Sequence, residues 1–215
     1  MFIELNNLLD IDCDRYPSNK SIGVVSENDI TSAVLHHFVS FTAKSKRILC
    51  LVTLQQTKSH YSNVSNKFGV NFQRHELIHV DLMSYLQNVF LSCSDSADAV
   101  DPCKDIKCVF DLVQRSVADV IESNEVLVIF DDLTPLMAVG FRDRDVFALV
   151  HFLHSWLQQQ QNLTLVTNVT TNCEDESSVL LARYLAHHSD VTVRLTPLPT
   201  GHSKHVHGQV TVSSK

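Results

Sequence analysis

Glycine is scarce in this sequence, which has only 5 glycines among its 215 residues. Glycine-rich loops bind phosphate groups because residues without a Cβ atom let backbone amides approach the ligand closely. So few glycines therefore argue against a nucleotide enzyme that depends on such a loop.

Positive charge is also in short supply. The chain has 17 Lys and Arg residues against 24 Asp and Glu residues, which gives a formal net charge of -7 with His neutral. Affinity for nucleic acid phosphates comes mainly from Lys and Arg side chains that displace counterions. This composition argues against a protein that binds RNA or DNA by bulk charge alone.

Long apolar runs, a secretory signal and a cysteine framework are all missing. The longest apolar stretches, such as 48–54, are far shorter than the roughly 20 residues that cross a bilayer. The first ten residues carry acids where a signal peptide has a basic flank. The cysteines form no CxxC pair, so we expect reduced thiols in a soluble intracellular protein. They stand at positions 13, 50, 93, 103, 108 and 173.

The rest of the composition is that of a globular protein, with 44% hydrophobic and 19% charged residues. We expect a single domain over 1–215, with its core in 20–213. An acidic stretch of small residues predicts a surface loop over 93–105.

Strand and helix patterns alternate along the chain. Apolar and β-branched runs predict strands at 21–25, 47–54, 77–80, 126–130, 163–167 and 191–195. Helical spacing predicts helices at 30–43, 57–68, 81–92, 106–123, 145–160 and from about 177 to 188, and Gly69 is expected to end the second of them. Strands separated by helices of this length pair in parallel through crossovers. The fold class is therefore α/β, a mostly parallel sheet with helices on both sides.

The alternation changes near the end of the chain. Gly201 and Gly208 punctuate two short alternating segments, 204–207 and 209–213. These segments predict a C-terminal antiparallel hairpin.

The loop after the first strand occupies the place of a phosphate-binding loop in nucleotide enzymes. Such a loop has the pattern G-x-x-x-x-G-K-[ST], whereas residues 26–33 read SENDITSA. Both glycines and the lysine are absent, and Glu27 and Asp29 add charge that repels a triphosphate. The segment is better explained as a capped helix start, that is, a degenerate phosphate loop.

Asp131 and Asp132 follow the strongest apolar strand, 126–130. A carboxylate at this place holds magnesium in P-loop enzymes. Carboxylates at the end of a parallel strand also cap the next helix or face solvent, and no lysine-bearing loop is present to bring a nucleotide. The degenerate loop at 26–33 and the Asp-Asp pair after an apolar strand together suggest a P-loop ATPase fold that does not perform the ATPase chemistry.

Other patterns of reactive or charged residues are weaker. His202, His205 and His207 form a local cluster without an evident further metal ligand, so an interface or solvent-facing hairpin explains them better. No nucleophile elbow is present. The remaining histidine pairs are expected to be surface or hydrogen-bonded residues. These pairs are His36 with His37, His151 with His154, and His187 with His188.

Basic residues gather in two small groups, which are candidates for contact with RNA. They are Lys44, Lys46 and Arg47, and Arg142 with Arg144. Solvated surface is the simpler interpretation of both groups. Acidic neighbours of the second group further weaken its candidacy for contact with RNA.

Several short patches resemble one known family, the sixth subunits of the Elongator complex. The patches run in the same order over nearly the whole chain, and it is their joint occurrence that is specific. They are MFIELNNLL at 1–9, HHFVSF at 36–41, SHYS at 59–62, DDL at 131–133, TG at 200–201 and VHGQ at 206–209. Members of the family usually continue beyond the last patch with strand-forming sequence, whereas this chain stops at Lys215.

The resemblance implies a RecA-like fold without working nucleotide motifs. It also implies a non-catalytic subunit, without a cofactor or a bound metal, that assembles with subunits four and five into a hetero-hexameric accessory ring. Such a ring joins the catalytic Elongator subcomplex, supports modification of the wobble uridine of tRNA, and binds tRNA as an assembly. We expect a cytoplasmic protein, for which a nuclear location is also open, with no membrane partner.

Two alternatives from other classes stay open. One is an active RecA-like ATPase with an unorthodox phosphate site, and the other is a free-standing tRNA-binding module. The net charge of -7 opposes the second alternative.

Overall fold

The computed structural model describes residues 3–9, 11, 18–27, 32–45, 47–70, 77–93, 105–198 and 208–215. The strands are β1 (Ser21–Glu27), β2 (Ile48–Thr53), β3 (Leu77–Asp81), β4 (Val126–Phe130), β5 (Leu163–Thr171), β6 (Val191–Thr196) and β7 (Gln209–Ser214). The helices are α1 (Ile3–Leu9), α2 (Ser32–Lys44), α3 (Lys58–Lys67), α4 (Leu82–Cys93), α5 (Lys107–Ile121), α6 (Thr134–Ala138), α7 (Asp143–Gln159) and α8 (Glu176–His188).

The strands form one seven-stranded sheet in the order β3-β2-β4-β5-β1-β6-β7. Every neighbouring pair is parallel except β6 and β7, which run antiparallel with Thr196 opposite Gln209. This confirms the predicted mostly parallel sheet with an antiparallel pair at the C-terminal end. The predicted hairpin segment 204–207 lies outside the described residues.

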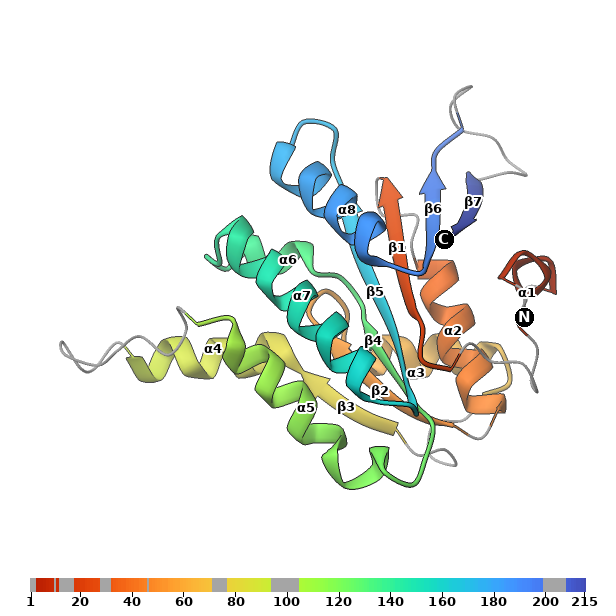
Figure 1. Cartoon of the computed structure of the whole chain (residues 1–215), viewed down its shortest axis with the longest axis horizontal. Helices are drawn as coiled ribbons and strands as arrows, with labels where there is room; N and C mark the ends of the chain where they lie inside the picture. The colour runs from red at the N-terminus through yellow and green to blue at the C-terminus, as the bar shows by residue number, and fades with distance from the viewer. Residues whose placement is uncertain are drawn as a thin grey trace.

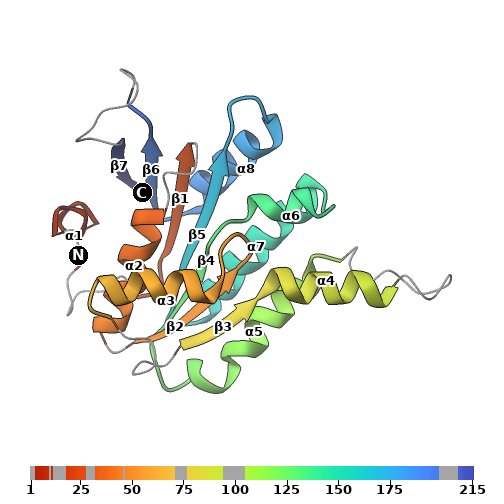
Figure 2. The same ribbon diagram turned by 180° about the vertical axis from the view of Figure 1, so that it is seen from behind.

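Helices cover both faces of the sheet, as predicted. Figure 1 shows α5, α7 and α8 on one face, and Figure 2 shows α2 and α3 on the other. Consecutive residues of a strand point to opposite faces, so each buried strand supplies both cores. Val25 lies in the core beneath α5, α7 and α8, whereas its neighbour Val24 lies in the core beneath α2 and α3.

Local chemistry explains where α3 begins and ends. The Thr57 side chain accepts a hydrogen bond from the backbone N–H of His60 at 3.2 Å, which satisfies one of the free donors at the helix start. After the helix, Gly69 has φ +75°, a left-handed conformation that side chains with a Cβ rarely adopt. Gly69 therefore ends the turn after α3, as the sequence predicts.

The helix α8 approaches β1 unusually closely, and Gly23 makes this possible. A Cβ atom at Gly23 would lie 2.5 Å from Ser189 Oγ and 3.1 Å from Leu185 Cγ. Glycine at this position lets α8 cover the middle of the sheet.

The clearest differences from the sequence prediction are in strand β5, helix α1 and the short helix α6, which was not predicted. Strand β5 extends to Thr171 rather than ending at Thr167, and its last four residues pair in parallel with β1. The helix α1 was not predicted, and its Leu5 is buried against the core beneath α2. Within the described residues, no helix is long and apolar enough to span a membrane.

Candidate functional site at the carboxyl edge of the sheet

The carboxyl ends of the parallel strands meet at one edge of the sheet, and the loops there diverge. The chain leaves β1 toward α2 on one face, whereas it leaves the neighbouring β5 toward α8 on the other. Such switch points are where α/β proteins bind ligands, because the diverging loops leave a crevice. Two hollows lie at this edge, with volumes of about 580 Å³ and about 270 Å³.

Asp131 stands at the expected metal position, but its carboxylate is occupied by backbone N–H groups. Oδ1 accepts from Leu54 at 2.8 Å and from Asp132 at 2.8 Å. Oδ2 accepts from Gln55 at 3.1 Å and Gln56 at 3.0 Å. The side chain is 1% exposed, and burial raises the pKa of Asp131 to about 6. Its observed role is to hold the turn after β2 against the end of β4.

Asp132 also joins segments of the chain. Its Oδ1 accepts from the backbone N–H of Thr134 at 2.9 Å and of Thr170 at 3.3 Å. Burial raises the pKa of Asp132, and the residue lines the larger hollow. The hydrogen bond to Thr134, at the start of α6, matches the helix-capping interpretation of the sequence. Neither aspartate faces solvent, because both are 1% exposed.

The degenerate phosphate loop is only partly described, because residues 28–31 lie outside the described residues. Ser26, at its start, is buried, and its hydroxyl donates to Thr170 Oγ1 at 3.4 Å. The start of the loop is thus attached to β5, next to the segment that Asp132 holds.

The described residues of the two basic groups lie at opposite edges of the sheet. Arg47 immediately precedes β2 at the amino edge, where its Nε forms an ion pair with Glu125, and its side chain is 12% exposed. Lys44 is exposed at the end of α2 near the same edge. Lys46 lies outside the described residues.

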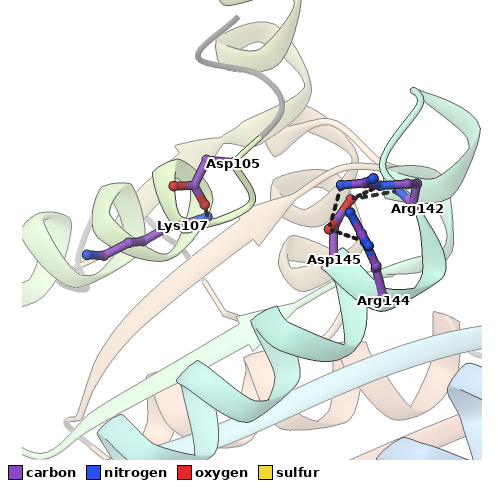
Figure 3. Close-up of polar contacts among 5 residues, drawn as sticks. All are labelled: Asp105, Lys107, Arg142, Arg144 and Asp145. Carbon is purple, nitrogen blue, oxygen red and sulfur yellow. Dashed lines mark hydrogen bonds and ion pairs between the residues drawn. The ribbon is translucent and has the colours of Figure 1, made fainter. Parts of the chain in front are cut away.

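Arg142 and Arg144 flank the start of α7 at the carboxyl edge. Figure 3 shows both side chains turned toward Asp145, with Arg142 Nε at 2.9 Å and Arg144 Nε at 3.6 Å from its carboxylate oxygens. The two side chains are 60% and 70% exposed. The same view shows Lys107, at the start of α5, pointing away from this group. The four candidates that the structure describes, Lys44, Arg47, Arg142 and Arg144, therefore do not form one basic surface.

The histidine pairs are associated with helices, and several are buried. His36 Nε2 lies 3.3 Å from His60 Nε2, and the His36 ring packs 5.1 Å from Tyr61. His188 packs against Tyr184 with ring centroids 4.1 Å apart. No group of three metal-binding side chains occurs within the described parts of the chain. The cluster of His202, His205 and His207 lies outside them.

One charged pair was missed by the sequence reasoning. Arg183 of α8 and Arg194 of β6 line the smaller hollow together with Glu27. The two arginines are eleven positions apart, on a helix and on the strand that follows it, so no local motif marks them. Their meeting depends on the crossover from α8 to β6.

Comparison with known proteins finds relatives over nearly the whole chain. The family model described as Elongation complex protein 6 matches residues 2–215. The Elongator complex protein 6 of Homo sapiens is 27% identical over 228 residues, which covers 99% of this chain and 85% of the human protein. The Xenopus laevis protein of the same name is 27% identical over 226 residues, with the same coverage.

Solved structures of similar fold are more distant in sequence. A KaiC-like protein from Pyrococcus horikoshii OT3 has a TM-score of 0.61 at 12% identity, covering 93% of this chain and 80% of that one. The flagellar accessory protein FlaH from Methanocaldococcus jannaschii has a TM-score of 0.65 at 13% identity, covering 98% and 84%. These similarities confirm the RecA-like α/β fold that the sequence resemblance implied.

Proposed function

The chain belongs to the Elongation complex protein 6 family, and we propose on this basis that it is a non-catalytic subunit of the Elongator complex. It assembles with subunits four and five into a hetero-hexameric ring of RecA-like domains, with two copies of each. The ring works beside the catalytic subcomplex in the cytoplasm and supports modification of the wobble uridine of tRNA. The observation that carries the proposal is the family match over residues 2–215.

The environment of Asp131 supports a non-catalytic role. A carboxylate that coordinates magnesium needs free oxygens directed toward the metal. Both oxygens of Asp131 accept hydrogen bonds from the backbone, and the side chain is buried. This geometry favours a structural aspartate over the active ATPase alternative.

The distribution of charge supports RNA binding by the ring rather than by the chain alone. The net charge is -7, and the described candidate RNA contacts are divided between two edges of the sheet. Lys44 and Arg47 lie near one edge, and Arg142 and Arg144 lie at the other. Arg47 is largely covered and paired with Glu125. A continuous basic path for tRNA then needs surface from the neighbouring subunits.

The test is co-expression of the full chain with the fourth and fifth subunits, followed by native mass spectrometry. We expect one species with the mass of two copies of each subunit, and self-association of the chain when it is expressed alone. A monodisperse monomer that binds neither the fourth nor the fifth subunit would contradict the proposal.

The same purified ring tests catalysis. We expect no ATP hydrolysis that depends on this subunit, so the Asp132→Asn variant should leave the rate unchanged. The matched control is Asp143→Asn, which changes an aspartate at the same edge that accepts a hydrogen bond from Ser177 Oγ. Hydrolysis that is lost only in an assembled Asp132→Asn ring would establish the ATPase instead.

A further inference from the structure

The hollow of about 270 Å³ lies where β1 and β5 end, and the proposed function assigns it no role. Its charged lining residues come from three elements: Glu27 from the end of β1, Arg183 from α8 and Arg194 from β6. Both arginines are exposed, and Glu27 is half-buried. The hollow thus concentrates two guanidinium groups on a chain of net charge -7.

Strand register explains why the two arginines share this hollow. Val193 and Leu195 of β6 are buried in the core beneath α2. Arg194 lies between them, so its side chain points to the opposite face of the sheet, where α8 packs. Figure 1 shows β6 next to β1, over which α8 packs, with none of the described helices in front of β6 or β7.

The two guanidinium groups are not neutralised within the described structure. No ion pair or hydrogen bond joins Arg183 or Arg194 to another described residue, although Glu27 lines the same hollow. Every other arginine discussed above has a carboxylate partner. Two unpaired arginines that converge on one concave site indicate an anion as the ligand.

Glu27 belongs both to the hollow and to the start of the degenerate phosphate loop, whereas Arg183 and Arg194 come from α8 and from the side of β6 that faces away from α2. That loop leads from β1 into α2, on the face where Ile22 and Val24 are buried. The hollow is lined by Val179 and Arg183 of α8, which packs on the opposite face at Gly23. A ligand held by Arg183 and Arg194 therefore lies on the α8 side of β1.

We propose that Arg183 and Arg194 form a binding site for a single phosphate group. Each guanidinium presents several N–H donors in a planar fork that matches phosphate oxygens. The two arginines and Glu27 together give the lining a formal charge of +1, which balances the single negative charge of a phosphodiester. A volume of about 270 Å³ corresponds to roughly nine water molecules, which accommodates a phosphate group with the adjoining sugar. The source is an RNA phosphodiester or a free nucleotide. The site does not depend on ring assembly, because all its residues belong to this chain.

The experiment titrates the full chain, labelled with ¹⁵N, both alone and in the ring assembled with unlabelled subunits four and five, with inorganic phosphate, ATP and a uridine hexanucleotide. We expect the side-chain Nε–H resonances of Arg183 and Arg194 to shift with each phosphate ligand that the site accepts. Arg183→Gln or Arg194→Gln should weaken binding about tenfold and lower the salt dependence by about one phosphate contact. The matched control is Arg115→Gln, which removes an exposed arginine of α5 whose Nε bonds Asp111 O. This variant should bind within twofold of the unchanged chain.

The ligands distinguish the two sources and the main competitor. Binding of the hexanucleotide assigns the site to RNA, whereas binding of ATP and phosphate without the hexanucleotide assigns it to a free nucleotide. A tetraglutamate peptide that binds as tightly as phosphate would overturn the proposal, because the site would then recognise protein carboxylates. Equal weakening by Arg115→Gln, or no response to any of the phosphate ligands, would overturn it as well. Circular dichroism melting checks that each variant is folded.

Discussion

Acid should destabilise this chain, and two buried histidines of α2 account for much of the effect. His36 and His37 are 4% and 2% exposed, and burial lowers the pKa of each from 6.5 to about 4. His60, which faces His36, lowers the pKa of His36 further. The unfolded chain therefore takes up these protons near pH 6.5, whereas the folded chain takes them up only near pH 4. Between these values protonation favours the unfolded state.

The size of the effect follows from the two pKa values. Moving from pH 7.5 to pH 5.0 should cost about 2 kcal/mol of unfolding free energy for each histidine, or about 4 kcal/mol for both. Asp131 acts in the opposite direction. Its pKa is raised from 3.8 to about 6, so the folded chain is protonated first and gains about 1 kcal/mol over the same range. We expect a net loss of about 3 kcal/mol from these three groups.

The assay is urea unfolding followed by circular dichroism at pH 7.5, 6.0 and 5.0. His36→Gln should reduce the loss between pH 7.5 and pH 5.0 by about 2 kcal/mol, whatever the variant costs at pH 7.5. His151→Gln is the matched control, because His151 lies exposed on α7, and its loss should equal that of the unchanged chain. A His36→Gln variant that lost as much unfolding free energy between pH 7.5 and pH 5.0 as the unchanged chain would refute the reasoning. An unchanged chain that was more stable at pH 5.0 than at pH 7.5 would also refute it.

Two further predictions concern packing and charge. Gly23→Ala should cost about 1–3 kcal/mol of unfolding free energy because its Cβ would meet Ser189 Oγ at 2.5 Å. Adding Ser189→Ala should make the double variant less destabilised than the sum of the two single variants, and strict additivity in urea unfolding would contradict the contact. Arg47→Gln should cost about 1 kcal/mol, since Arg47 is 12% exposed and joins the start of β2 to Glu125. Arg144→Gln, at a side chain 70% exposed, should change the melting temperature little. Equal effects of the two substitutions would contradict the expected difference between a covered and an exposed ion pair.

The sequence predicts best those elements whose signals are local. The apolar run of β4 and the Thr57 and Gly69 positions around α3 depend on neighbouring residues, and their predicted bounds agree with the structure to within a few residues. The last residues of β5 were missed because Asn168 and Thr170 resemble a loop. They extend the strand because β1 pairs with them from the other end of the chain.

The candidate site was less predictable, because its contacts join distant segments. Asp131 could be placed at the end of a strand, but all its N–H partners except the adjacent Asp132 are 75 to 77 residues away, in the turn after β2. Arg194 carries no signal of its own within a β-branched strand, and only the crossover brings it to Arg183. The family resemblance supplied what local patterns could not, since it identified the fold from patches spread along the chain.

The central position of β1 has a consequence for synthesis of the chain. Both of its sheet neighbours, β5 and β6, are made late, and Ile22 pairs with Val166 and Val191. At roughly 5–20 residues per second, a ribosome needs on the order of ten to thirty seconds after completing β1 before β5 emerges. During that interval β1 has two open edges and an apolar sequence, a state that is prone to aggregation. We therefore expect folding to be completed only at the end of translation, when chaperones and waiting partner subunits compete for the nascent chain.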